Sequence, residues 1–252
     1  MKINYQVHGA GKSILLIHGL FGSLSNLSMI ARDLAQDHQV IQVDLRNHGR
    51  SFHAPTMSYH EMAEDIRQVL AELKVENVTI IGHSMGGKVA MALTALMPNH
   101  TDSLIVIDMA PVIYKTRRHD EVFKAVREVI AEGVTHRQDA AAVMRRTLKD
   151  EGVIQFILKS FHQGRWMFNV DALYNNYDEI SGWIELPVWN GPTLFIKGEN
   201  SNYITNAYRP DILRQFPNAK AHVISGTGHW VHGEKPEATL RVIRRFLSEA
   251  SL

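Results

Sequence analysis

The chain has 252 residues, of which 45% are hydrophobic and 21% are charged, so it is long enough to bury a substantial core. Its formal net charge of +1 argues against nucleic-acid binding through bulk charge, and the absence of cysteine excludes disulfides, thiolate catalysis and cysteine metal sites. The N-terminal apolar run SILLI is interrupted by His18 and Gly19, so it predicts neither a signal peptide nor a membrane span. We therefore expect a soluble, cytoplasmic protein.

Short apolar runs alternate with helical patterns along most of the chain. The runs are mostly continuous, as in strands that are buried on both faces of a parallel sheet. The expected strands span residues 14–17, 40–43, 78–81, 104–107, 193–196 and 221–224. The expected helices span residues 27–35, 59–73, 88–97, 212–216 and 236–247. This alternation predicts an α/β fold with a mainly parallel, doubly wound sheet.

One region interrupts the alternation of strands and helices. From residue 112 to about residue 183 the patterns are helical only, as in the stretches DEVFKAVREVIAEG and GVIQFILKSF. A helical insertion between two strands predicts a cap over the carboxyl edge of the sheet. We therefore expect a core formed by residues 1–111 and 184–252, with a helical cap formed by residues 112–183.

The stretch IIGHSMGGKVAMAL, residues 80–93, carries the first chemical motif. Its Gly-x-Ser-x-Gly pentapeptide is centred on Ser84, follows an expected strand and opens an expected helix. Glycines two positions before and after the serine let the strand and the helix approach closely. A structural glycine turn is the rival interpretation. A phosphate-binding loop is a weaker one, because the pattern G-x-x-x-x-G-K-[S/T] is absent. The motif therefore predicts that Ser84 is a nucleophile.

A serine hydroxyl becomes a good nucleophile only when a neighbouring base takes its proton. The stretch HVISGTGHWVHGEKP places His229 on a loop after the last expected strand and before the last expected helix. This position predicts that His229 is the base. His232 is the rival, and because it lies nearer the helix we interpret it as a structural hydrogen-bonding residue. We interpret His18 and His83 as packing beside the nucleophile turn.

Across nearly its whole length the chain resembles the α/β-hydrolase superfamily and, more narrowly, the bacterial YbfF esterase group. The stretches that carry the resemblance are LIHGLFGSLSNL (16–27), VDLRNHGRS (43–51), GHSMGGK (82–88), IDMAP (107–111), GVIQFILKSF (152–161) and GHWVHGEKP (228–236). The resemblance implies a serine esterase with a helical cap that hydrolyses small carboxylic esters through an acyl-enzyme. It also implies an oxyanion hole formed by the backbone N–H groups of Leu20 and Met85, with Phe21 as an alternative donor.

The residue that orients the histidine departs from the family's commonest pattern. That carboxylate usually follows the strand that here reads TLFIKGEN, but Ser201 stands where an aspartate is expected. Serine is neutral and cannot stabilise an imidazolium ion as a carboxylate does. Glu199 is close, but we expect its side chain to point away. We predict that Asp108, at the end of the strand after the nucleophile helix, is the acid, with Ser201 as a second hydrogen-bonding partner of His229.

Four further residues are candidate substrate contacts. Arg117 and Arg118 would bind an anionic leaving group such as the phosphates of coenzyme A, so an acyl-CoA thioester is a possible substrate besides a small ester. Phe161 and Trp230 would contact an apolar part of the substrate. We expect no cofactor, no metal, no nucleic-acid partner and no membrane insertion. Cofactor-free haloperoxidases, carbon–carbon bond hydrolases and slow-turnover ligand receptors share this architecture and remain alternatives.

Overall fold

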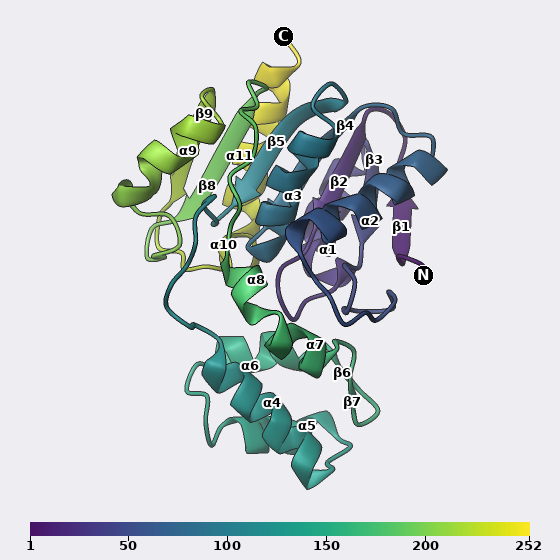
Figure 1. The fold of residues 1–252 in the computed structure, drawn as a ribbon, viewed down its shortest axis with the longest axis vertical. Coiled ribbons are helices and arrows are strands. Elements are labelled where there is room, and N and C mark those ends of the chain that lie inside the picture. The colour runs from purple at the N-terminus through teal and green to yellow at the C-terminus, as the bar shows by residue number, and fades with distance from the viewer.

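Seven strands form one central sheet in the computed structural model, which describes all residues 1–252 (Figure 1). In sheet order the strands are β1 (Tyr5–His8), β3 (Gln39–Val43), β2 (Ser13–Ile17), β4 (Val78–His83), β5 (Thr101–Ile107), β8 (Thr193–Gly198) and β9 (Ala219–Ile224). All neighbouring strands are parallel except β1, which pairs with β3 in the antiparallel direction at one edge. The predicted α/β fold with a mainly parallel sheet is confirmed.

Side chains of successive residues in each strand point to opposite faces of the sheet, and helices cover both faces. Leu15 and Val106 belong to the apolar cluster on one face, whereas Ile14 and Ile105 belong to the cluster on the other. The first face is covered by α2 (Tyr59–Glu72), α3 (Met85–Leu96) and α9 (Arg209–Gln215), and the second by α1 (Ser28–Leu34) and α11 (Pro236–Ala250). Burial on both faces explains why the central strands are continuous apolar runs.

Several elements differ from the sequence predictions. Strand β1 was not predicted, because its residues are alternately half-buried and exposed and so form no continuous apolar run. Helix α3 begins at Met85 rather than at residue 88, because the chain enters the helix directly after Ser84. A short 3-10 helix, Leu24–Leu27, also precedes α1.

Between β5 and β8 the chain forms the helical segment, residues 120–181, which lies beyond one end of the sheet (Figure 1). Its helices are α4 (Asp120–Glu132), α5 (Arg137–Met144), α6 (Glu151–Leu158), α7 (Val170–Asn175) and α8 (Tyr177–Ser181). The prediction that this region is helical only was incomplete, because β6 (Phe161–His162) and β7 (Arg165–Trp166) pair as a hairpin. Gln163 and Gly164 adopt positive φ angles and close its turn.

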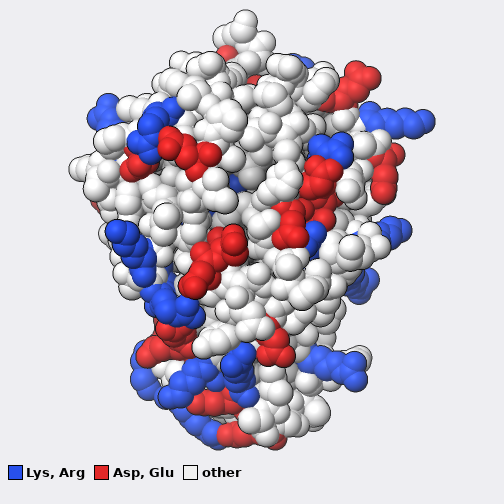
Figure 2. Space-filling view, viewed as in Figure 1, with Lys and Arg blue, Asp and Glu red and all other residues white.

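Charged side chains of both signs are interspersed over the face seen in Figure 2. Within the helical segment, Arg145 pairs with Glu151 and Arg146 pairs with Glu132. Exposed ion pairs of this kind contribute little to stability, so the segment is held mainly by its apolar contacts. None of the helices combines the length and the apolar character that crossing a membrane requires.

Lys88 of α3 is fully buried and has no carboxylate partner. Its Nζ donates hydrogen bonds to the carbonyl oxygens of Gly182, at 2.6 Å, and Ser181, at 3.3 Å, where α8 ends. The same Nζ lies between 4.9 and 5.8 Å from the ring centres of three aromatic residues, Tyr59, Tyr114 and Trp183. Burial lowers the pKa of Lys88 from its ordinary 10.5 to about 7. Lys88 thus links the nucleophile helix to the end of the helical segment.

The lowered pKa of Lys88 predicts a pH dependence of stability. Between about pH 7 and 10.5 the unfolded chain holds this proton and the folded chain does not, so the free energy of unfolding should rise with pH. Lys88→Met should abolish this contribution, so that the difference in free energy of unfolding between the variant and the wild type changes by about 5 kcal/mol across the window. Urea unfolding at several pH values measures it. A difference that stays constant with pH would contradict the assignment.

Candidate active site

Ser84 lies in the tight turn between β4 and α3, with φ 56° and ψ −125°. A non-glycine residue in this region of backbone space is strained and is held there by the surrounding structure. A Cβ atom on Gly82 would lie 2.1 Å from the carbonyl oxygen of Gly86, and one on Gly86 would lie 2.3 Å from that of His18. Both glycines are therefore required for the strand and the helix to meet at the serine.

We expect Gly86→Ala to lower the free energy of unfolding by about 3 kcal/mol or more, because the added methyl group would overlap two backbone carbonyl oxygens. Gly233→Ala is the matched control, since the atom nearest to its Cβ would be 3.6 Å away. The control should change stability by less than about 1 kcal/mol. Thermal unfolding of both variants checks the contrast, and equal effects would refute the close approach at Gly86.

Three side chains that the sequence predicted to act together lie in one hydrogen-bonded chain. His229 Nε2 is 2.8 Å from Ser84 Oγ, and His229 Nδ1 is 2.6 Å from Asp108 Oδ2. Asp108 is fully buried just after β5, whereas His229 lies on the loop between β9 and the short helix α10 (Val231–Glu234). In this geometry Nδ1–H donates to the carboxylate, and Nε2 accepts the hydroxyl hydrogen of Ser84.

Ser201 contacts the carboxylate and not the histidine, which differs from the predicted bond to His229. Its Oγ donates a hydrogen bond to Asp108 Oδ2 at 2.5 Å. The backbone N–H of Gly198 donates to Asp108 Oδ1 at 3.1 Å. The carboxylate therefore receives hydrogen bonds from three residues, and the two from β8 and its following loop fix its orientation toward His229.

Glu199 points away from Asp108 and His229, as the sequence predicted. Its Oε2 accepts a hydrogen bond from the Gly226 backbone N–H at 2.7 Å. The Glu199 backbone N–H donates to the carbonyl of Ile224, and the Asn200 N–H donates to that of Thr227. Glu199 and Asn200 thus hold the loop that carries His229 through hydrogen bonds to the residues that precede it.

Aromatic rings and other histidines surround His229. The Tyr203 ring stacks on the imidazole with a centroid distance of 3.8 Å and an interplanar angle of 18°, and the Arg118 guanidinium lies 4.2 Å from the Tyr203 ring centre. Tyr203 was missed in the sequence, where no motif marks it except its place two residues after Ser201. The ring of His83 approaches the backbone carbonyl of His229 with Nε2 at 2.9 Å. Burial lowers the pKa of His83 well below its usual value.

His232, the rival base, lies behind His83 and does not reach Ser84. Its ring centre is 4.5 Å from that of His83, and its Nδ1 is buried without a hydrogen-bond partner. Burial lowers the pKa of His232 to about 4, so this ring is neutral at neutral pH. His232 is therefore a packed residue, and the hydrogen-bonding role predicted for it is not seen.

The candidate oxyanion donors differ in whether their backbone N–H groups already donate a hydrogen bond within the protein. The Phe21 backbone N–H donates to His48 Nε2 at 3.1 Å, so it is not free for a substrate. The Leu20 N–H makes no hydrogen bond within the protein. Met85 is the first residue of α3, where a backbone N–H has no acceptor within its own helix. These observations favour Leu20 and Met85 over Phe21.

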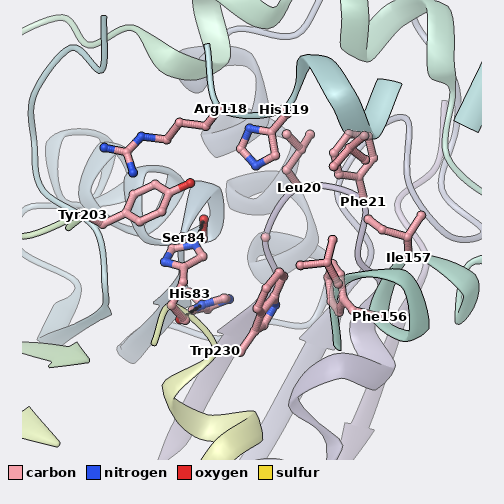
Figure 3. A pocket seen from close by; sticks show the side chains of 14 residues that line it. Leu20, Phe21, His83, Ser84, Arg118, His119, Phe156, Ile157, Tyr203 and Trp230 are labelled. Carbon is pink, nitrogen blue, oxygen red and sulfur yellow. Dashed lines mark hydrogen bonds between the residues drawn. The ribbon is translucent and has the colours of Figure 1, made fainter. Parts of the chain in front are cut away.

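Ser84 opens into a cavity of about 200 Å³ between the sheet edge and the helical segment (Figure 3). Val122 of α4 and Phe156 and Ile157 of α6 supply apolar wall, and the Phe156 ring lies 4.9 Å from that of Trp230. Two of the four predicted substrate contacts, Arg118 and Trp230, line this cavity.

The other two predicted substrate contacts lie elsewhere. Arg117 does not line the cavity, because its guanidinium is held in ion pairs with Asp120 at 2.8 Å and Asp178 at 3.4 Å. Phe161 is buried against Trp166 in the hairpin, with 4.8 Å between ring centres. Phe161 therefore packs inside the helical segment and does not line the cavity.

Comparison with known proteins shows the family to which the chain belongs. Residues 12–149 match the family model described as the alpha/beta hydrolase fold. The chain belongs to the α/β-hydrolase family. Within this α/β-hydrolase family it is 53% identical to the esterase YbfF of Escherichia coli, over 99% of this chain and 100% of that protein. The predicted resemblance to the YbfF group is therefore confirmed.

More distant members of the α/β-hydrolase family match over almost the same length. The chain is 35% identical to the sn-1-specific diacylglycerol lipase ABHD11 of Danio rerio, over 98% of this chain and 83% of the relative. Among solved structures, a marine microorganism esterase superposes with a TM-score of 0.93 at 36% identity, covering 97% of this chain and 99% of that one. These relatives are named as esterases or lipases, which bears on the reaction proposed below.

Proposed function

We propose that the protein is a carboxylic ester hydrolase that works through an acyl-enzyme on Ser84. The observation that carries this proposal is the hydrogen-bonded chain from Ser84 Oγ through His229 to Asp108, with distances of 2.8 and 2.6 Å. Relatives of this chain are named esterase and diacylglycerol lipase, which supports ester hydrolysis as the class of reaction.

In the proposed mechanism, His229 Nε2 accepts the hydroxyl proton while Ser84 Oγ forms a bond to the ester carbonyl carbon. The backbone N–H groups of Leu20 and Met85 stabilise the negative charge on the carbonyl oxygen, and one such donor is worth about 3 kcal/mol. Asp108 stabilises the imidazolium that forms. His229 then gives the proton to the leaving alcohol oxygen as the carbon–oxygen bond breaks. Water, deprotonated by His229, hydrolyses the acyl-enzyme in the same way.

We further propose that residues 112–183 act as a cap on a core formed by residues 1–111 and 184–252. The support is the cavity wall, because Val122, Phe156 and Ile157 of the helical segment face the same cavity as Ser84. A wall of apolar side chains excludes water and strengthens the electrostatic contacts around the reacting carbonyl. The size of ester that reacts is then limited by residues outside the core.

Hydrolysis of acyl-CoA thioesters is a narrower proposal that depends on Arg118. This arginine lines the cavity, its Nη1 donates to Asn202 Oδ1 at 2.5 Å, and its Nε is buried without a partner. A guanidinium that lines the cavity and has no carboxylate partner can bind an anionic leaving group. Arg117 is the matched control, because its partners are Asp120 and Asp178. Arg118→Gln should raise KM for acyl-CoA more than Arg117→Gln does, with KM for neutral esters less affected.

The test of the proposed function combines covalent labelling of the nucleophile with a count of ester turnovers per protein molecule. A fluorophosphonate should modify Ser84 alone, as located by peptide mass spectrometry, because only this serine has its proton accepted by a histidine. A panel of p-nitrophenyl esters should show many turnovers per protein molecule, and the labelled protein should show none. Labelling at another serine, or a single turnover followed by product retention, would contradict a Ser84 esterase.

A further inference from the structure

Lys88 is a fully buried lysine that the proposed mechanism does not use. No carboxylate pairs with it, and burial is what lowers its pKa to about 7. As an ammonium ion the side chain would carry three N–H donors, but Nζ meets only two acceptors in the protein, the carbonyl oxygens of Ser181 and Gly182. A neutral amine carries two N–H donors. The acceptors around Nζ therefore match the side chain in its neutral form.

The aromatic rings around Nζ replace only part of the hydration that an ammonium ion has in water. The ring faces of Tyr59, Tyr114 and Trp183 attract a cation. Both phenols stay neutral, because burial raises the pKa of each, and the Glu179 carboxylate raises that of Tyr59 further. The Arg118 guanidinium, 5.3 Å from the Tyr114 ring centre, adds a positive charge. None of these groups is a counter-ion for the amine, so its proton is held less tightly here than in water.

The same Nζ is bonded to the end of α8, where the helical segment rejoins the core (Figure 1). The Gly182 carbonyl has Lys88 as its only hydrogen-bonding partner, at 2.6 Å. The Ser181 carbonyl also accepts a hydrogen bond from the Tyr114 N–H at 2.8 Å, which joins the two connections between the segment and the core. Lys88 and Tyr114 together therefore hold the end of α8.

The beginning of α8 is bonded to two residues that line the cavity at Ser84. The Tyr177 hydroxyl accepts a hydrogen bond from the Arg118 N–H at 3.2 Å and lies 2.7 Å from His119 Nδ1. Burial lowers the pKa of His119 to about 4, so the ring is neutral and its Nδ1 accepts the hydroxyl hydrogen. Arg118 and His119 both line the cavity. Displacement of α8 would therefore move part of the cavity wall, while the nucleophile and its base, which belong to the core, stay in place.

The direction of a pH effect on this attachment follows from the proton on Lys88. With α8 in place the pKa of Lys88 is about 7, whereas the ordinary value in water is 10.5. Between these two values the displaced form binds a proton that the attached form lacks. Rising pH therefore favours attachment of α8, and falling pH favours its displacement. Below about pH 7 both forms hold the proton, and the effect is complete.

We propose that Lys88 is a positioning residue for the cavity, which holds α8 in place while its amine is neutral and releases α8 when the amine gains a proton. The basis is the match between two N–H donors and two carbonyls in a cage without a counter-ion. The effect on substrates rests on the proposed esterase function. The attachment of α8 does not, and it is measurable without any turnover.

Hydrogen exchange of the backbone amides at this attachment tests the proposal directly. The Tyr114 and Gly182 amides are both hydrogen-bonded to carbonyls of α8, so they exchange when the attachment opens. After correction for the intrinsic exchange rate, their protection should rise about tenfold per pH unit between about pH 7 and 9, because each opening takes up one proton. Mass spectrometry or NMR spectroscopy of the full chain measures this rise.

Three variants separate the titration of Lys88 from other titrations. Lys88→Met has a side chain of similar length and no proton to gain, so the protection of the two amides should no longer rise with pH. Lys88→Gln keeps two N–H donors without a titrating group, and it should give the same flat profile if the methionine variant does not fold. Lys220→Met is the matched control, because this exposed lysine pairs with Glu249, and the wild-type rise should remain.

Ester kinetics test the consequence for the cavity. p-Nitrophenyl acetate requires little beyond the groups at Ser84, whereas p-nitrophenyl octanoate also extends along the cavity wall. Because both esters need the same base, the octanoate-to-acetate ratio of kcat/KM cancels the titration of His229. In the wild type this ratio should rise at least about threefold between about pH 7 and 9, through KM rather than kcat. In Lys88→Met it should stay constant.

Amide protection that does not change with pH in the wild type, or that rises equally in Lys88→Met, would overturn the proposal. A constant ester ratio in the wild type would also overturn it, because α8 would then be released without an effect on the cavity. Failure of the proposed esterase function would appear differently. Neither ester would turn over and Ser84 would not react with a fluorophosphonate, while the amide protection would still report on the attachment of α8.

Discussion

Ser84→Ala is expected to lower kcat for ester hydrolysis by about five to six orders of magnitude, because no other hydroxyl group lies within hydrogen-bonding distance of His229 Nε2. The substitution removes one oxygen atom and leaves the strained turn with a small side chain, so the fold should persist. Single-turnover and steady-state assays on one ester, together with circular dichroism, measure both effects. Ser251→Ala, whose hydroxyl bonds only to the Leu247 carbonyl, is the control. Activity above about 1% of the wild type in Ser84→Ala would place the nucleophile elsewhere.

Asp108→Asn is expected to lower kcat by about four orders of magnitude. The amide NH₂ group would face two donors, the Ser201 hydroxyl and the His229 Nδ1–H, at the position where the carboxylate now accepts both. The imidazole would then favour the tautomer with hydrogen on Nε2, which cannot accept the proton of Ser84. The orienting charge would be lost at the same time. Measuring kcat as a function of pH on one ester checks this result.

Ser201→Ala should have a much smaller effect than Asp108→Asn. It removes one neutral hydrogen bond to the carboxylate, worth about 1 kcal/mol, and leaves the charge in place, so kcat should fall roughly tenfold or less. Glu199→Gln is a second control, because its amide oxygen can still accept the Gly226 N–H bond. If Ser201→Ala proved more damaging than Asp108→Asn, or if Glu199→Gln matched it, the assignment of Asp108 as the acid would be wrong.

The strands that the sequence predicted well are those buried on both faces. The run around Leu15 is continuous because each side chain meets a helix layer, whereas β1 is short and lies at an edge, so its pattern carries little signal. Ser84 was identifiable because close packing requires glycines at fixed spacing around it. His229 and Asp108 were identifiable from their positions after particular strands.

The remaining details depend on contacts that no local pattern encodes. Ser201 has one rotatable hydroxyl, and only the placement of Asp108 Oδ2 decides that it bonds to the carboxylate rather than to the imidazole. The stacking of Tyr203 on His229 joins two loops that are distant in sequence. Phe161 could not be assigned from its apolar character, because the same property suits a cavity wall and the interior of the helical segment. Which neighbour each of these side chains contacts is decided by the three-dimensional structure and not by the local sequence.

Asp108 and Ser201 approach the same point from neighbouring strands, which has an evolutionary consequence. The Asp108 N–H is bonded to the Ile196 carbonyl of β8, and the Ser201 hydroxyl lies 2.5 Å from Asp108 Oδ2. An aspartate acquired at position 201 would therefore stand beside the existing carboxylate, and two carboxyl groups so close would share a single negative charge. Such an intermediate keeps one charge beside the histidine throughout. The carboxylate that orients the histidine can thus move from position 108 to position 201 by single substitutions. No intermediate sequence would lack a carboxylate beside the histidine.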